Sequence, residues 1–399
     1  MRERADADVM CYDRIMSNGP ILIYDKSAIQ RLSPDEAKWL THFFRCNITP
    51  VYLREVLGDL AKPVKRGEAK SMVTALAFKT SGLGSLPNVE HSELIDMAIL
   101  GNPVEMRGVP VVGGGQRVTA ANGETGVFFD ESPEEKTLRR WSDGAFHSEE
   151  HQHAARYRAN AKATDLESFV KASKAARPKG AQIATSLADL LTEIDLFLDN
   201  PAAQYRTLHT ALEMFDQPEA SARHVKKHWA AYGRPIIRHF LPYTYHCLRV
   251  SVLFGHGVGL QLIPPRPTNL IDIQYLFYLP FCMAFTSADK LHHELVPLFL
   301  NSNQLYVKSD DMQEALRALV AYYRGHETEL RAGGTMGFAR YPPLDIETRI
   351  HRIYDRLMPR WREDASSPQK KITPEENARI MEKLRPMMEA IEKATSAQQ

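Results

Sequence analysis

Two short apolar runs, far apart in the chain, each lead to an aspartate. Residues 20–24 (Pro-Ile-Leu-Ile-Tyr) precede Asp25, and residues 283–287 (Met-Ala-Phe-Thr-Ser) come just before Asp289. An apolar run of this length, bounded by polar residues, is typical of a buried strand in a parallel sheet. Because open α/β sheets bind ligands at the carboxyl ends of their strands, both aspartates are predicted to lie on one edge. The pair predicts an acidic, metal-binding site built from both halves of the chain.

Capping and periodicity predict the first elements around these runs. Ser33-Pro-Asp-Glu36 opens a helix that runs to about residue 45, with proline at its first position and acids in its first turn. Residues 47–52 are predicted to form a second strand, and residues 68–79 another helix. This alternation indicates the beginning of a doubly wound α/β domain.

The alternation stops near residue 101. Gly113-Gly-Gly115 and the charged stretch 130–140 predict loops or a small hairpin. Between residues 161 and 229 the composition is helical and polar, without the fixed period of a repeat array. This part is therefore interpreted as a helical insertion.

The α/β pattern resumes after the insertion. A long helix is predicted over residues 235–262, and another begins near Leu270, before the second apolar run. A further strand is predicted at residues 304–307, followed by a helix over 310–324. The tail ends in a helix opened by Thr373-Pro-Glu-Glu376, which is interpreted as an appendage or a partner-binding helix.

Four acids along the chain carry a resemblance to a known family. In chain order they are Asp25 in I-L-I-Y-D-K-S, Glu55 in V-Y-L-R-E-V-L, Asp272 in N-L-I-D-I-Q-Y-L and Asp289 in A-F-T-S-A-D-K-L-H. This order resembles that of PIN domains, over residues 18–100 and 266–310. The resemblance implies a metal-dependent nuclease in which these four acids are catalytic and bind Mg²⁺ or Mn²⁺.

Three more polar residues match or extend the family pattern. Ser287, two residues before Asp289, matches a position where the family often has a hydroxyl, and Ser27 matches a polar position beside the first acid. Asp59 lies one turn after Glu55 and is an additional acid. These three are accessory candidates, and local turn or helix polarity is the alternative explanation for Ser27 and Asp59.

The chemistry of such a site follows from charge. Carboxylates that converge in one cleft repel each other, so without a cation some would hold protons through a raised pKa. Mg²⁺ and Mn²⁺ prefer oxygen ligands, activate water and stabilise charge on a phosphoryl oxygen. The predicted reaction is hydrolysis of a phosphodiester bond by a metal-activated water.

A polyanionic substrate needs nearby cations to approach an acidic pocket. Lys62, Lys65 and Arg66 follow Glu55, and Lys290 follows Asp289, so these four are predicted to guide phosphates. A solvated helix face is the alternative for this basic cluster. A set of aromatic residues near the second run is predicted to be core packing, not base-stacking surface: Tyr275, Tyr278, Phe281 and Phe285.

Composition excludes several other classes of protein. The 399 residues are 44% hydrophobic, which supports a packed interior, and 50 lysines and arginines nearly balance 49 acids. The four scattered cysteines, Cys11, Cys46, Cys247 and Cys282, form no Cys-x-x-Cys pair and follow no secretory signal, so free thiols in a reducing cytoplasm are expected. Charges within residues 235–262 argue against a membrane span.

Two other motifs have weaker interpretations. His147-Ser-Glu-Glu-His151 fits a short zinc-protease pattern, but Ser148 is a good N-cap, which would leave His147 outside the helix that must present both histidines. Gly113-Gly-Gly115 lacks the lysine and hydroxyl of a phosphate-binding loop. We interpret the first as a solvated turn and the second as a flexible turn.

We therefore expect an α/β fold with a PIN-like parallel sheet flanked by helices, interrupted by a mostly helical insertion and followed by C-terminal helices. The core is predicted at residues 18–100 and 235–325, the insertion at 101–234 and the extension at 326–399.

The predicted function is a metal-dependent nuclease that is not associated with membranes, with RNA as the substrate that the resemblance favours. A catalytically inactive PIN-like module that binds RNA or protein is the alternative, and a small-molecule phosphatase is a third hypothesis. The insertion or the C-terminal helices are then the expected surface for a protein partner or a second copy of the chain.

Overall fold

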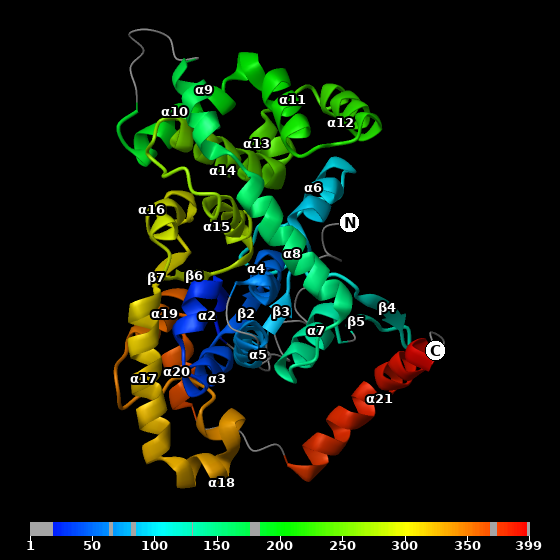
Figure 1. The fold of residues 1–399 in the computed structure, drawn as a ribbon. Coiled ribbons are helices and arrows are strands. Elements are labelled where there is room, and N and C mark those ends of the chain that lie inside the picture. The colour runs from blue at the N-terminus through cyan, green and yellow to red at the C-terminus, as the bar shows by residue number, and fades with distance from the viewer. Residues whose placement is uncertain are drawn as a thin grey trace.

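A five-stranded parallel sheet forms the centre of the computed structural model, which describes residues 19–63, 67–80, 85–129, 131–175, 184–367 and 373–396 (Figure 1). From one edge to the other, its strands are β3 (Ser85–Pro87), β2 (Arg45–Ile48), β1 (Ile21–Tyr24), β6 (Ala284–Ser287) and β7 (Leu305–Lys308). The two predicted apolar runs thus form β1 and β6, which are neighbours: Leu22 lies opposite Ala284 and Tyr24 opposite Thr286.

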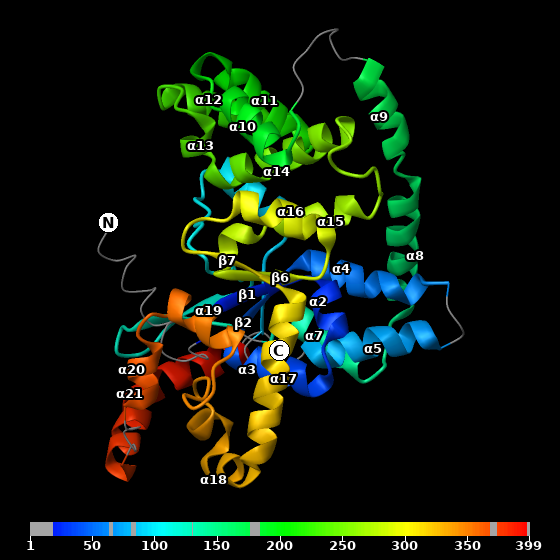
Figure 2. The same cartoon turned by 90° about the vertical axis from the view of Figure 1, so that its left-hand side faces the viewer.

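Helices cover both faces of the sheet, as the predicted fold class requires (Figure 2). One face carries α3 (Pro34–Phe43), α5 (Glu68–Thr80) and α17 (Ser309–Gly325). The other carries α14 (Pro242–Gly259), α15 (Asn269–Leu276) and α16 (Lys290–Phe299). Every residue of β1 and β6 is buried, because helices shield both sides of the central strands.

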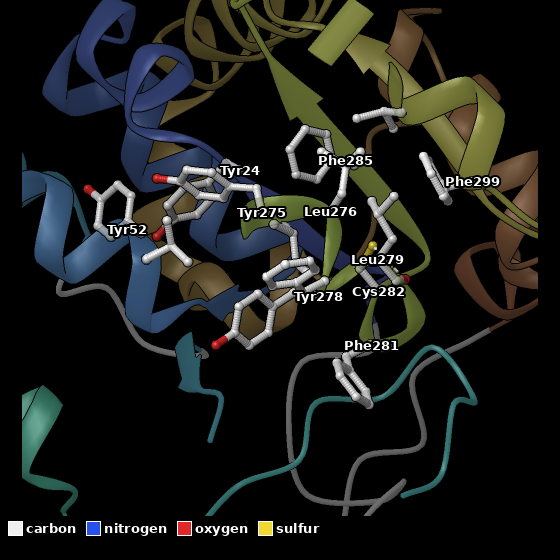
Figure 3. Close-up of a cluster of buried hydrophobic side chains, with 14 of the residues drawn as sticks. Tyr24, Tyr52, Tyr275, Leu276, Tyr278, Leu279, Phe281, Cys282, Phe285 and Phe299 are labelled. Atoms are coloured by element: carbon white, nitrogen blue, oxygen red, sulfur yellow. Dashed lines mark hydrogen bonds between the residues drawn. The ribbon is translucent and has the colours of Figure 1, made fainter. Parts of the chain in front are cut away.

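Aromatic side chains fill the core beside β6 (Figure 3). Tyr275, Tyr278, Phe281 and Phe285 are each fully buried, so the prediction that they pack the core is confirmed. Tyr24 and Tyr52 meet edge to face, with ring centroids 5.3 Å apart. The buried side chains of both helical layers belong to this one core, which joins the two distant parts of the chain.

The insertion is mostly helical, as predicted, with a small hairpin near its start (Figure 1). The hairpin consists of β4 (Gln116–Thr119) and β5 (Thr125–Phe128) and follows α6 (His91–Ile99). The helices of the insertion are α7 (Pro133–Ser142), α8 (Ser148–Ala163), α9 (Leu166–Ala175), α10 (Leu187–Leu198), α11 (Gln204–Met214) and α12 (Glu219–Ala231), with a 3₁₀ turn, η3 (Pro201–Ala203).

The remaining elements lie at the ends of strands or in the tail. Between the strands are α2 (Lys26–Arg31), α4 (Pro50–Gly58), η2 (Asp59–Ala61), α13 (Ile237–Phe240) and η4 (Leu279–Phe281). The predicted C-terminal extension contains α18 (Glu327–Phe338), α19 (Arg349–Leu357), α20 (Trp361–Ser366) and α21 (Pro374–Ser396). Helix α21 contacts β4 of the insertion hairpin.

Three local predictions were wrong, and each has a capping or proline explanation. The strand predicted at residues 47–52 ends at Ile48, because the Thr49 hydroxyl accepts a hydrogen bond from the Tyr52 amide and Pro50 begins α4. The charged stretch 130–140 contains the start of α7, which has a capping box at Ser132.

The third concerns the helix predicted over residues 235–262, which is two helices, α13 and α14. The backbone leaves helical geometry at Leu241, with φ −130° and ψ 67°, just before Pro242. Proline lacks the amide hydrogen that a continuous helix would need at this position.

Cys46, Cys247 and Cys282 are free and buried, as predicted, and Cys11 lies outside the described residues. In the described part of the chain, no helix combines the length and apolarity needed to cross a membrane.

Glu150 holds α8 against α7. Its carboxylate accepts hydrogen bonds from the Arg140 guanidinium at 2.6 and 2.8 Å, from the Trp141 indole at 2.9 Å and from the His147 amide at 2.7 Å. Burial alone would raise the pKa of Glu150, but these donors lower it to about 2. The group therefore stabilises the fold above the ordinary glutamate pKa of about 4.3, and this contribution is lost as the pH falls towards 2.

We predict that Glu150→Gln lowers the free energy of unfolding at pH 7 by about 1–3 kcal/mol, because a charged acceptor of several hydrogen bonds is removed. The deficit relative to the wild type should shrink at pH 3, where the wild-type contribution is itself diminished. Urea unfolding of the wild type and the variant at both pH values measures this difference in the free energy of unfolding. Glu149→Gln, at the exposed neighbouring position, should change little; equal losses in both variants would contradict the prediction.

Candidate functional site

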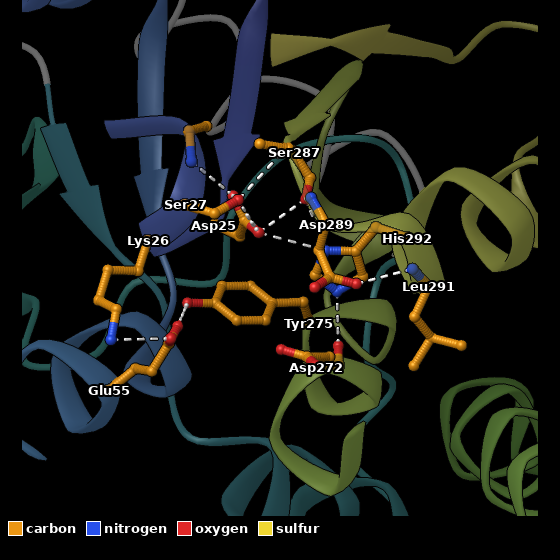
Figure 4. Close-up of polar contacts among 12 residues, drawn as sticks. Asp25, Lys26, Ser27, Glu55, Asp272, Tyr275, Ser287, Asp289, Leu291 and His292 are labelled. Carbon is orange, nitrogen blue, oxygen red and sulfur yellow. Dashed lines mark hydrogen bonds and ion pairs between the residues drawn. The ribbon is translucent and has the colours of Figure 1, made fainter. Parts of the chain in front are cut away.

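The carboxyl ends of β1 and β6 present a group of buried polar residues (Figure 4). Asp25, 3% exposed, follows β1 and is the N-cap of α2, where it accepts a hydrogen bond from the Ala28 amide at 2.9 Å. The Ser27 hydroxyl donates to Asp25 at 2.7 and 2.8 Å, and the Ser287 hydroxyl does so at 2.7 Å. The two serines predicted as accessory residues therefore hold the first aspartate.

His292, from α16, is a component of the site that the sequence analysis missed. Its ring is fully buried, with Nδ1 2.8 Å from the Ser287 hydroxyl and 3.4 Å from a carboxylate oxygen of Asp25. Its Nε2 lies 2.8 Å from the backbone carbonyl of Asp272. The sequence did contain a clue to this role: His292 lies three residues after Asp289, among the apolar residues that form the buried side of α16.

Asp25 and His292 shift each other's protonation. Burial favours the neutral ring, but the hydrogen bond and charge of Asp25, with help from Asp272, raise the pKa of His292 to about 9. Burial would also raise the pKa of Asp25, yet the hydrogen bond and charge of His292, with the two serine hydroxyls, lower it. At neutral pH the two groups form a buried ion pair.

Asp272 and Asp289 lie close to His292 in the same view (Figure 4). Asp289 is the N-cap of α16, and its carboxylate accepts a hydrogen bond from the Leu291 amide at 2.7 Å. Asp272 lies in the first turn of α15. Burial raises the pKa of Asp272 to about 7; His292 opposes this shift, whereas the charges of Asp289, Glu55 and Asp25 add to it. The four predicted carboxylates are thus brought into one electrostatic neighbourhood.

Glu55 is held by two partners from different elements. Its carboxylate lies 3.0 Å from the Lys26 ammonium and accepts a hydrogen bond from the Tyr275 hydroxyl at 2.8 Å. The Lys26 ammonium also lies 3.1 Å from Asp59, and Lys62 lies 2.8 Å from the same oxygen. Asp59 is therefore buried and paired with two lysines.

The predicted phosphate-guiding cations have different surroundings. Lys62 is engaged by Asp59, whereas Lys290 is exposed beside Asp289. Lys65 and Arg66 lie outside the described residues. The structure thus leaves Lys290 as the candidate guide next to the carboxylates.

Tyr157 is a second residue that the sequence analysis missed. It comes from α8 of the insertion, which packs on α4 and η2 and passes along one side of the core in Figure 2. A Cβ atom at Gly58 would lie only 2.7 Å from the Tyr157 ring, so the glycine permits the close approach. The hydroxyl is buried without a partner among the described residues, and burial, reinforced by the charge of Glu55, raises its pKa. The insertion therefore contributes to the wall of the site.

The donors of this site are carboxylate oxygens, which suit a divalent cation, but their positions in this structure do not form a metal-binding group. In the described parts of the chain, no group of three or more histidine, cysteine, aspartate or glutamate side chains could hold a metal ion. The reason is local: the oxygens of Asp25 are occupied by hydrogen bonds, and Glu55 is drawn to Lys26 and Tyr275. Asp272 remains under repulsion that a bound cation would relieve.

The alternative histidine motif is not assembled as a zinc site. His147 precedes the helix, as predicted, but it is itself the N-cap of α8, and residues 148–151 form the first turn of that helix, so the interpretation of this stretch as a solvated turn was wrong.

Comparison of the chain with family models, with curated proteins and with solved structures gave no match.

The raised pKa of Asp272 leads to a stability prediction. Because the folded-state pKa of about 7 exceeds the ordinary value of about 3.9, Asp272 lowers the stability of the fold progressively as the pH rises from about 3.9 to about 7, and the full penalty persists above pH 7. Asp272→Asn removes this charge with little change of shape. In metal-free buffer at pH 8, the variant should be about 1–3 kcal/mol more stable than the wild type in urea unfolding.

At about pH 3, below the ordinary aspartate pKa, this carboxyl group is protonated in both the folded and the unfolded wild type, so the difference between the two proteins should nearly vanish. This comparison serves as the internal control for lost side-chain contacts. A variant that is destabilised equally at both pH values would contradict the prediction.

Proposed function

We propose that this protein is a metal-dependent nuclease of the PIN-like type that hydrolyses phosphodiester bonds, with RNA as its substrate. The observation that carries the proposal is that β1 and β6 are adjacent and bring Asp25 and Asp289 to one edge of a parallel sheet. Asp272 and Glu55 complete the acidic neighbourhood from α15 and α4. This arrangement supports the interpretation that the order of the acids suggested.

The four carboxylates would hold Mg²⁺ or Mn²⁺. Such an ion, when bound, activates water near neutral pH and stabilises charge on a phosphoryl oxygen. The chain's own residues have separate tasks: His292 keeps Asp25 ionised and oriented, and Asp272 is the carboxylate whose repulsion from its neighbours a bound cation would relieve. Lys290 attracts the phosphate backbone at the exposed side.

One observation favours the second candidate, an inactive PIN-like module that binds RNA or protein. Lys26 and His292 already place two cations among the acids, at 3.0 Å from Glu55 and 3.4 Å from Asp25. These two cations neutralise part of the acidic charge without a metal ion. In either role, the buried free cysteines support a reducing, cytoplasmic environment.

The nuclease proposal is tested by incubating the purified protein with single-stranded RNA and DNA, with and without Mn²⁺. We expect cleavage of RNA only with the metal, and a loss of about 100-fold or more in Asp289→Asn. This variant keeps the helix cap, because asparagine caps as well as aspartate. It is a cleaner test than Asp25→Asn, which also removes the ion-pair partner of buried His292 and so alters the core together with the site.

Asp216→Asn is the matched control for cleavage. Asp216 is exposed in the turn after α11 at φ 47°, a conformation that asparagine tolerates well. Full cleavage by Asp289→Asn, with the wild type requiring Mn²⁺, would remove this aspartate from the mechanism.

Metal binding separates the two candidate functions. If the protein is a nuclease, calorimetry should show saturable Mn²⁺ binding to the wild type and weaker binding to Asp272→Asn, because one carboxylate ligand is lost. An intact fold that binds no Mn²⁺ would favour the inactive module.

A further inference from the structure

Helices α11 and α12 of the insertion, with the turn after α12, carry exposed aromatic residues and cations. We call Tyr205, Arg206, Lys226, Lys227, Tyr232 and Arg234 the aromatic–basic face. Tyr205 is 57% exposed and Tyr232 is 68% exposed, which are large values for side chains of this size. Because single exposed apolar residues are common, their combination with charge is the informative feature.

Neighbouring rings hold both tyrosines in place. The Lys226 ammonium lies 5.5 Å from the centroid of the Tyr205 ring, and Tyr205 lies 6.4 Å from the buried Trp229 ring. Tyr232 meets His228 edge to face, with centroids 4.7 Å apart. The rings are therefore supported from one side and open to solvent on the other.

The cations of this face differ from their neighbours in having no acidic partner. Within residues 184–367, which are described without a gap, no ion pair involves Arg206, Lys226, Lys227 or Arg234. By contrast, Arg223 lies 3.2 Å from Glu219, and Arg238 lies 2.7 Å from Asp199. Four positive charges are thus left to attract an anion.

We propose that the aromatic–basic face binds single-stranded nucleic acid. Cations that contact phosphates, alternating with rings on which bases stack, are the recurring composition of such surfaces. An acidic peptide would use the charges but not the rings, and a duplex keeps its base faces stacked internally. The proposal rests on the proposed function only for its choice of RNA, since binding requires no cleavage.

The face belongs to the same packed body as the acidic site. Helix α11 contacts α14, and α14 contacts α15, the helix that carries Asp272. Figure 1 shows α11 and α12 beyond α14 at one end of the molecule. A strand bound here is held by a surface with a fixed position relative to the carboxylates, so the face would retain substrate while the site acts on it.

The test measures binding by fluorescence anisotropy, with the full chain, labelled oligouridine of about 16 nucleotides and EDTA to prevent metal-dependent cleavage. The double variant Lys226→Glu and Lys227→Glu should weaken binding by at least tenfold and reduce the salt slope by about 1.4, since each contact to a single strand contributes about 0.7. Tyr205→Leu should weaken binding about tenfold and leave the salt slope unchanged.

The matched control is Lys171→Glu with Lys174→Glu, which makes the same charge change at exposed positions of α9 in the same insertion. It should bind RNA nearly as the wild type does. Circular dichroism and thermal melting check that every variant is folded.

Unchanged RNA affinity in both face variants would overturn the proposal, as would equal losses in the control. Wild-type protein that binds no single strand, or that prefers polyglutamate, anionic vesicles or duplex, would also overturn it. The nuclease proposal is tested separately. If the protein binds RNA through this face but shows no Mn²⁺-dependent cleavage, the binding proposal is supported and the nuclease proposal is not. If the protein cleaves RNA but the face variants bind it as the wild type does, only the nuclease proposal is supported.

Discussion

The buried ion pair between Asp25 and His292 is the interaction on which the site depends. The two residues are 267 positions apart in number, yet Ser287 bridges them with contacts of 2.7 and 2.8 Å. Because an isolated buried charge is costly, neither residue is stable there without the other. The pair therefore joins the first strand to the helix after β6, and it orients the first carboxylate through a rigid core instead of a loop.

Around this pair the protein balances negative charge with cations of its own. Lys26 lies between Glu55 and Asp59, and His292 lies beside Asp25, so the carboxylate with a raised pKa is Asp272. This uneven balance explains why the acids share a neighbourhood without forming a metal-binding group among the described residues. It also identifies the position where an added cation would relieve the largest repulsion.

The insertion is more than a spacer between the halves of the core. Helix α8 brings Tyr157 against Gly58 at the edge of the acidic site, while α10 packs on α14 and α16 of the core. Its outer helices present unpaired cations and exposed rings. The same segment therefore helps to build the inner wall of the site and supplies the surface proposed for nucleic acid.

The sequence by itself determined the two buried strands that lead to Asp25 and Asp289, most helices, and the α/β class, because apolar runs and caps act over a few residues. The order of the acids, through the family resemblance, also predicted that Asp272 and Glu55 join them. Only the tertiary structure decided their partners: Tyr275 reaches Glu55 across 220 positions, and Tyr157 comes from α8 of the insertion to lie against Gly58. Such contacts depend on how distant elements pack, which no local pattern records.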